Sequence, residues 1–201
     1  YVQHRTWSHG LGRGRATKRI NRRQAANFME APEFANELGR PLNCHVTIAF
    51  AHTDIEAAEV ESVFRKIRDD RFKPWLAHRR RRDRAPQYGP PTFVWAQENG
   101  RDGQGNGFPH VHWLLHMPPA LLHDFTIRVR CWVGEFGGNV DWSETVVKVD
   151  PATTPGGLRR YLLKDLSPRL REHFNIPARW PGTYGVVYGK RIGFSQNLGP
   201  T

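Results

Sequence analysis

Two shortages and one absence limit what this sequence can encode. Cysteine is scarce: the chain has Cys44 and Cys131 only, they have no metal-ligand spacing, and both have apolar neighbours. They predict buried free thiols in a reducing compartment, and exclude a disulfide scaffold or a cysteine zinc site.

No apolar run approaches the length of a membrane span and no signal peptide is visible, so we expect a cytoplasmic protein without a membrane partner.

Acidic residues are the second shortage. The 201 residues include 19 Asp and Glu against 30 Lys and Arg, a formal net charge of +11. This excess favours an anionic partner, and nucleic acid comes first because neutralising its phosphates releases condensed counterions. Hydrophobic residues still make up 38% of the chain, with 7 Trp and 11 Phe, which predicts a packed core rather than a disordered chain.

The chain divides into a basic N-terminal part and a folded unit. Residues 1–40 are predicted to form a basic arm, rich in Arg, Lys and Gly, and then a short helix over 24–38 that ends at Gly39. We expect the arm to become ordered on a partner. Residues 41–201 form the second predicted unit.

This second unit predicts an α+β, ferredoxin-like fold. Strands are expected at 42–51, 92–99, 109–117 and 144–150, with one more in the tail 185–199. Helices are expected after Asp54 to residue 70, from Pro118 to residue 132, and from Pro155 to Ser167. The segment 72–91 is interpreted as a long connection, and 100–107 as a glycine-rich hairpin loop. This order is a split βαβ arrangement, a central antiparallel sheet with helices on one face.

Apolar spacing indicates which helix faces are buried. The helix after Pro118 has the predicted apolar set Leu121, Leu122, Phe125, Ile127 and Val129. In the last helix, the apolar stripe predicted to pack against the sheet consists of Leu158, Leu162 and Leu166.

A candidate metal site lies on the predicted hairpin. His110 and His112 are two residues apart on a strand, so both side chains point to the same face. Imidazole is the commonest protein metal ligand, and this spacing directs two nitrogens at one ion. Glu98 lies on the strand before the glycine-rich loop. A register that sets Glu98 across from the pair completes a two-histidine, one-carboxylate site with open positions for water and substrate oxygens.

The donor set indicates which ion binds. Mixed nitrogen and oxygen ligands suit Mn²⁺ or Mg²⁺ bridging a phosphate, although zinc or another transition metal would also bind. An isolated His-x-His pair is more often two polar residues facing water, but the carboxylate strand and tight glycine loop favour the metal interpretation. His116 has the same parity but lies about 13 Å from His112 along an ideal strand, so we interpret it as structural.

The segment Pro109-His110-Val111-His112-Trp113-Leu114-Leu115 resembles the metal motif of the HUH endonucleases, in which two histidines flank a hydrophobic residue. In that superfamily the pair sits on the central sheet of a ferredoxin-like domain, and an upstream acidic residue often supplies a third ligand. Residues 43–50 resemble the family's first motif, a hydrophobic strand with polar residues. The resemblance covers residues 42–166 and implies single-stranded DNA or an origin hairpin as the partner.

The chain has five tyrosines that could act as a nucleophile, namely Tyr1, Tyr88, Tyr161, Tyr184 and Tyr188. Tyr161 differs from the others because it lies on a predicted helix with Lys164, three residues on, on the same face. A phenol with a pKa of about 10 is a poor nucleophile unless its charge is stabilised. A nearby ammonium and a metal that polarises the phosphate supply that stabilisation. Position 165 is Asp, so we expect a single-tyrosine enzyme.

Tyr161-Leu162-Leu163-Lys164 also resembles the tyrosine-x-x-lysine motif of replication initiators in this superfamily. The resemblance implies that Tyr161 attacks a DNA phosphate and leaves a 5′-phosphotyrosine link and a free 3′-hydroxyl. Glu98, His110 and His112 would hold the metal, and Lys164 would stabilise charge. Initiation of rolling-circle replication, with a host helicase as a further partner, is the role implied.

Runs of arginine are candidate contacts to the DNA backbone. The alternative interpretation is that they lie on helix faces exposed to solvent. These candidates are Arg79, Arg80, Arg81, Arg82, Arg159 and Arg160. Two other functions stay open. One is a tyrosine transposase or relaxase of the same superfamily. The other is a non-catalytic single-stranded nucleic-acid-binding module, in which Trp95 and Trp113 would stack on bases. The sequence leaves the oligomeric state open.

Overall fold

The computed structural model describes residues 15–17, 19–101, 107–137, 145–177 and 185–198. Its helices are α1 (Arg22–Glu37), α2 (Val60–Lys66), a π-helical segment (Ile67–Phe72), α3 (Lys73–Arg82), α4 (Leu122–Gly137), α5 (Pro155–Leu162) and α6 (Pro168–His173). Its strands are β1 (Ala16–Thr17), β2 (Cys44–Ala49), β3 (Phe93–Arg101), β4 (Gly107–Leu115), β5 (Val147–Pro151), β6 (Val187–Tyr188) and β7 (Ile192–Phe194).

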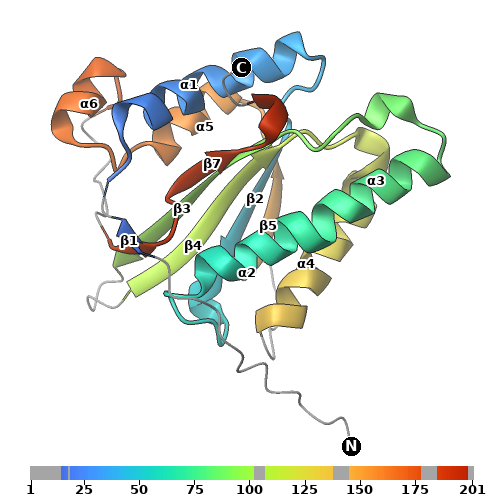
Figure 1. The fold of residues 1–201 in the computed structure, drawn as a ribbon, viewed down its shortest axis with the longest axis horizontal. Coiled ribbons are helices and arrows are strands. Elements are labelled where there is room, and N and C mark those ends of the chain that lie inside the picture. Colours follow the sequence, from blue (N-terminus) through green and yellow to red (C-terminus); the bar gives the residue numbers. More distant parts are fainter. Residues whose placement is uncertain (1–14, 18, 102–106, 138–144, 178–184, 199–201) are drawn as a thin grey trace, which may run out of the picture.

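A five-stranded antiparallel sheet forms the centre of the molecule (Figure 1). Its order is β5-β2-β4-β3-β7, and every neighbouring pair is antiparallel. The α+β class and the central antiparallel sheet are therefore confirmed. The strand expected in the tail is β7, which pairs with β3 at one edge. Gly193 allows this close approach, because a Cβ there would lie 2.7 Å from Trp95 Nε1.

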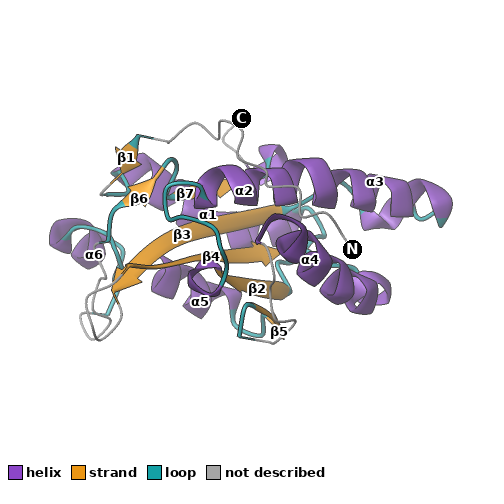
Figure 2. Ribbon diagram, turned by 90° about the horizontal axis from the view of Figure 1, so that it is seen from below, coloured by secondary structure: helices purple, strands orange, loops and turns teal. Residues whose placement is uncertain are grey.

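Helices cover both faces of the sheet, which corrects the prediction of helices on one face (Figures 1 and 2). Alternate residues of the central strands enter different cores. Trp113 packs with α2, α3 and α4 on one face, and Leu114 packs with α1 and α5 on the other. The sequence interpretation missed the second layer because it placed α1 within the N-terminal part. In the structure, Phe28 of α1 is fully buried in the core of that second face.

The predicted connection over 72–91 is wrong in its first half. Val60 to Arg82 is helical throughout, because α2 continues through the π-helical segment into α3. The run of arginines hid the end of this helix, since Phe72 and Leu76 are the buried apolar residues of its part from residue 72 to residue 82. Pro74 lies inside this continuous helix, just after the π-helical segment. At the other end, the helix begins at Val60 without a side-chain cap, so the expected cap at Asp54 is also wrong.

The helix predicted after Pro118 starts later and buries a different stripe. A short 3₁₀ turn precedes α4, whose buried residues include Phe125, Val129, Trp132 and Val133. Two members of the predicted apolar set are exposed instead, Leu122 at 37% and Ile127 at 50%. Position 127 falls off the stripe because two residues from Phe125 correspond to more than half a helical turn.

The helix expected from Pro155 is divided. α5 ends at Leu162, and single turns follow, in which Lys164 N–H donates to Tyr161 C=O. Leu162 and Leu166 are buried as predicted, and Leu158 packs beside them. Ser167 precedes α6. Lys164 therefore lies in the turn after α5 rather than on the helix.

Smaller expectations have mixed outcomes. Cys44 is a buried thiol, as predicted, but Cys131 is exposed. No helix in the described ranges is long and apolar enough to cross a membrane. The tip of the glycine-rich loop at 102–106, most of the basic arm, Glu144, Tyr1 and Tyr184 lie outside the described residues.

A candidate metal centre

Strand register brings the predicted metal ligands together on the face of the sheet that α5 covers. In the β3–β4 hairpin, Glu98 lies directly opposite His110, and Ala96 lies opposite His112. Trp95 and Trp113 alternate with these positions and fill the other core, so pleating turns the polar side chains the opposite way. The predicted antiparallel register is confirmed.

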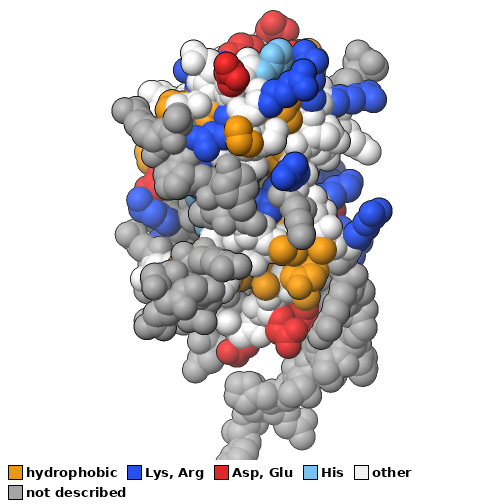
Figure 3. All heavy atoms as spheres, turned by 90° about the vertical axis from the view of Figure 1, so that its left-hand side faces the viewer, with side chains coloured by type: hydrophobic (Ala, Val, Ile, Leu, Met, Phe, Trp, Pro, Cys, Tyr) orange, Lys and Arg blue, Asp and Glu red, His pale blue; other side chains and the backbone are white. Residues whose placement is uncertain are grey.

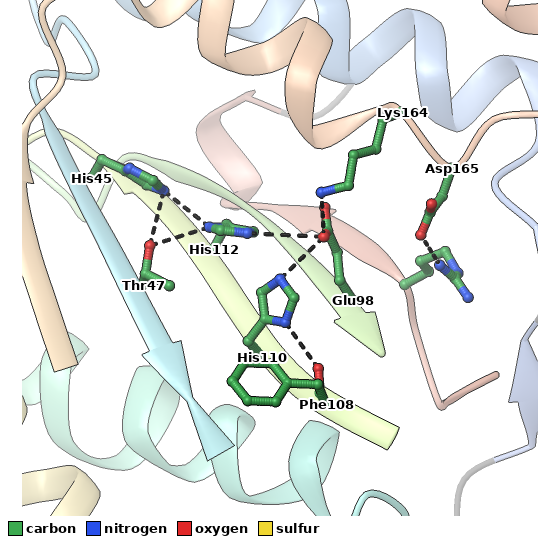
Figure 4. Close-up of polar contacts among 9 residues, drawn as sticks. His45, Thr47, Glu98, Phe108, His110, His112, Lys164 and Asp165 are labelled. Carbon is green, nitrogen blue, oxygen red and sulfur yellow. Dashed lines mark hydrogen bonds and ion pairs between the residues drawn. The ribbon is translucent and has the colours of Figure 1, made fainter. Parts of the chain in front are cut away.

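The three side chains converge on one point (Figure 4). His110 Nε2 lies 3.1 Å from Glu98 Oε2, and His112 Nε2 lies 4.0 Å from the same oxygen. One ligand atom from each residue lies within 4.8 Å of the other two. Glu98 and His112 are buried, whereas His110 is half-buried, so the centre opens on the His110 side. Such a group could hold one metal ion.

Unsatisfied polar atoms at this point fit a bound cation. Within the part of the chain that the structure describes, His112 Nε2 and Glu98 Oε1 are buried without a hydrogen-bond partner. Buried nitrogen and oxygen atoms are costly to leave unpaired, and a cation satisfies both. The contacts of His110 also fit a bound cation. Its Nδ1 lies 3.0 Å from Phe108 C=O, which can only accept a hydrogen bond. That contact places a proton on Nδ1 and directs Nε2 at the centre.

The protonation states also suit a cation. Burial alone would raise the pKa of Glu98, but the nearby His110 and His112 and the charge of Lys164 outweigh burial and lower that pKa to about 2. Burial lowers the pKa of His112 to about 3. At neutral pH the pair is therefore a carboxylate and a neutral imidazole, the forms that bind metals.

No family model, curated protein or solved structure matches this chain. The function is therefore inferred from the geometry of the centre and of the side chains around the three ligands.

Lys164 belongs to the centre as well. Its Nζ lies 2.5 Å from Glu98 Oε2 and 3.9 Å from the ring centroid of Tyr161. Burial opposes the ammonium charge, but Glu98 outweighs burial and raises the pKa of Lys164 above its ordinary value. The predicted proximity of Lys164 to Tyr161 is thus present, although a turn rather than a helix creates it.

Tyr161 lies at the edge of the centre. Its side chain is 37% exposed, and its ring centroid lies 6.1 Å from that of His112. The buried Leu162 beside it anchors the end of α5 to the sheet. A half-exposed phenol next to an ammonium and the candidate ligands can reach both solvent and a substrate that approaches the centre.

The sequence analysis missed His45 and Thr47 on β2. Thr47 lies opposite His112 in the sheet, and its Oγ1 lies 3.2 Å from His112 Nδ1. His45 Nε2 also lies 3.2 Å from His112 Nδ1, with the two rings stacked. The signal was present: positions 45 and 47 share parity on a strand whose other residues are apolar. What the sequence lacked was the pairing of β2 with β4.

Asp165, predicted only as the residue that replaces a second tyrosine, forms a buried ion pair. Its Oδ2 accepts a hydrogen bond of 2.8 Å from Arg191 Nη1, and each side chain is 2% exposed. Arg191 also donates to the carbonyls of Thr17 and Gly185. This pair ties the turn that carries Lys164 to the C-terminal part of the chain.

The structure separates most of the predicted DNA-contacting arginines from the metal centre. Arg79 to Arg82 form the last turn of α3, on the opposite face of the sheet. Arg79 pairs with Asp83 and Asp124 there. Arg159, at the end of α5, bonds instead to Met29 C=O and Glu33 of α1. Arg160 lies beside it on α5, next to Tyr161.

Proposed function

We propose that this protein is a metal-dependent single-strand DNA endonuclease of the HUH type, with Tyr161 as its nucleophile. The observation that carries the proposal is the convergence of Glu98, His110 and His112 beside Tyr161 and Lys164. Tyr161 and Lys164 lie far from the β3–β4 hairpin in sequence, yet they meet its three ligands in the arrangement that the resemblance implies. The sheet order β5-β2-β4-β3 supports a ferredoxin-like core, since it is the order fourth, first, third, second of a split βαβ unit.

The proposed reaction is a transesterification. Tyr161 Oη attacks the scissile phosphorus and loses its proton, and the bond from phosphorus to the 3′ oxygen breaks. The 3′ oxygen takes up a proton, and the 5′ phosphate stays bound to the tyrosine. Lys164, 3.9 Å from the ring centroid, stabilises the phenolate that develops. Glu98, His110 and His112 would hold Mn²⁺ or Mg²⁺, which supplies Lewis-acid polarisation of the phosphate.

A hollow beside α6 supports a nucleic-acid partner. It measures about 360 Å³ and is lined by Arg22, Arg169, Leu170 and His173. Arg22 Nη2 lies 3.4 Å from His173 Nε2. A guanidinium and an imidazole, both of which can carry a positive charge, therefore lie side by side in the hollow. Near the top of the face in Figure 3, the end of the molecule where α6 lies, Lys and Arg side chains gather together with His, Asp and Glu side chains. A guanidinium group can donate two hydrogen bonds to the oxygens of one phosphate. The two arginines of this hollow therefore suit the phosphate backbone of a DNA strand.

The binding-module alternative loses its main support. Trp95 and Trp113, the predicted stacking surface, are 2% and 0% exposed beneath α2 and α3. Neither indole can stack on a base in this fold. A transposase or relaxase shares the proposed chemistry and differs in its DNA substrate.

The test is a covalent adduct. Incubation with a pool of single-stranded and hairpin oligonucleotides and Mn²⁺ should give a protein–DNA band that survives denaturing electrophoresis. Tyr161→Phe should abolish that band, because it removes the only atom that bonds to phosphorus. Tyr188→Phe is the matched control and should retain it. An adduct that persists in Tyr161→Phe would contradict the nucleophile, and none from the unaltered protein would favour a binding module.

A further inference from the structure

The two side chains of β2 that contact His112 have no role in the reaction described above. Thr47 Oγ1 and His45 Nε2 each lie 3.2 Å from His112 Nδ1, and they lie 3.5 Å from each other (Figure 4). Asp150 lies opposite His45 on β5, on its other side. The contacts of His45 and Thr47 form a polar line from β2 to Nδ1 of His112, the ring nitrogen that faces away from the other two candidate ligands.

Two directions of hydrogen bonding are open to this line. In the first, His112 Nδ1–H donates to Thr47 Oγ1, whose hydroxyl donates to His45 Nε2. His45 then carries its own proton on Nδ1, the arrangement that a carboxylate at Asp150 favours electrostatically. In this direction the donors of His112 and Thr47 each have an acceptor, and His112 Nε2 keeps its lone pair.

The reverse direction leaves a buried donor unsatisfied. If His45 Nε2–H donates to Thr47, and Thr47 donates to His112 Nδ1, the His112 proton must lie on Nε2. The nearest carboxylate oxygen is then 4.0 Å away, too far for a hydrogen bond. Nε2 has no other partner among the described residues. An N–H there would also point at the position of the ion.

We propose that Thr47 and His45 are positioning residues that hold the proton of His112 on Nδ1 and so leave Nε2 free as a metal ligand. The inference rests on the proposed metal-dependent function. His110 has the same arrangement by a different means, because the Phe108 carbonyl fixes its Nδ1 proton. A histidine ligand is commonly oriented by such a partner on its second nitrogen, and loss of the partner typically weakens metal binding about 10–100-fold.

The experiment replaces the hydroxyl with a methyl group of similar size. Thr47→Val should weaken Mn²⁺ binding, measured by calorimetry, at least about tenfold, and Thr47→Ser should restore it. Side-chain ¹⁵N NMR without added metal should show His112 protonated on Nδ1 in the unaltered protein and in Thr47→Ser, and a mixture of tautomers in Thr47→Val. His45→Ala is a second variant, in case Thr47→Val does not fold.

His116→Gln is the matched control. That histidine follows the same strand, but its Nδ1 contacts the Pro41 carbonyl, so its loss should leave Mn²⁺ affinity unchanged. Unaltered affinity and an unaltered His112 tautomer in Thr47→Val would overturn the inference. If the unaltered protein binds no Mn²⁺, the proposed function fails, whereas the NMR spectra still decide where the His112 proton lies.

Discussion

At the scale of single residues, the candidate centre contains buried atoms that a cation would satisfy. His112 Nε2 and Glu98 Oε1 have no hydrogen-bond partner among the described residues.

A bound ion should stabilise the fold measurably. At a Mn²⁺ concentration of about 100 times the dissociation constant, the gain is about 2.7 kcal/mol. For a chain of this size, that corresponds to a rise in Tm of about 5–10 °C. His110→Gln, which removes the most exposed of the three ligands, should abolish most of the rise in a thermal unfolding scan.

A chelator provides the control for that measurement. It should return the unaltered protein to its metal-free Tm and leave His110→Gln unchanged. An equal rise in both proteins would place the ion elsewhere.

The parts of the candidate centre that are close together in sequence could be predicted. His110, His112 and Glu98 belong to one hairpin, so strand parity and a short loop were enough to predict their convergence. His45 was missed, because its contact with His112 depends on which strand pairs with β4. Parity shows that two side chains share a face, but it does not show which neighbouring strand completes that face.

At the scale of secondary-structure elements, the errors have a common physical cause. The α3 helix was interpreted as a connection because arginines occupy its exposed side and Pro74 its first turn. Helical periodicity depends on apolar residues, and here few were available to show it. Ile127 was assigned to the core of α4 because it is apolar, yet it is half-exposed. Tertiary packing, rather than residue type alone, decides which apolar side chains a helix buries.

Ion pairs of Asp69 in the continuous helix should make the stability of the fold depend on pH. Asp69, in the π-helical segment, lies between Arg68 at 2.6 Å and Lys73 at 2.7 Å. Burial would raise its pKa, but the hydrogen bonds from these two cations outweigh burial and lower the pKa of Asp69 to about 2. Because the pKa is lowered on folding, this carboxylate contributes stability above its ordinary pKa of 3.8. That contribution is lost as the pH falls towards 2.

Asp69→Asn tests this contribution. Since the carboxylate is partly exposed, we expect a loss of about 1 kcal/mol in the free energy of unfolding at pH 7. The variant should also lose less stability than the unaltered protein between pH 4 and pH 2. Denaturant unfolding at a series of pH values measures both effects. Parallel curves for the two proteins across that pH range would show that Asp69 is not stabilised by its neighbours.

At the scale of the whole molecule, the net charge of +11 favours an anionic partner but does not show where that partner would bind. The densest arginine run lies on α3, on the face opposite the metal centre, and part of it is engaged with Asp83 and Asp124. The hollow lined by Arg22 and Arg169 was not predicted, because these residues are 147 positions apart in the chain and only the fold brings them together.

Binding of single-stranded DNA should show which arginines touch phosphates. Each phosphate contact adds a slope of about −0.7 to the dependence of log affinity on log salt concentration. Arg169→Gln should therefore weaken binding to any oligonucleotide and make the slope shallower by about 0.7. Fluorescence anisotropy over a range of salt concentrations measures this change.

Arg128→Gln is the matched control, because Arg128 is an exposed arginine on α4 that pairs with Asp124. It should leave the slope unchanged. If both substitutions reduce the slope equally, the protein attracts DNA through its overall charge rather than through the hollow.

The β3–β4 hairpin also has a consequence for the order in which the protein assembles. Glu98 and His110 are 12 residues apart, whereas Glu98 and Lys164 are 66 residues apart. Closing the longer loop costs about 1.5 kcal/mol more in chain entropy, and hairpins form within microseconds. The ligand set therefore takes shape early and locally, while Tyr161 and Lys164 arrive with the slower long-range docking of α5. During folding, the three candidate metal ligands therefore meet before the proposed nucleophile reaches them.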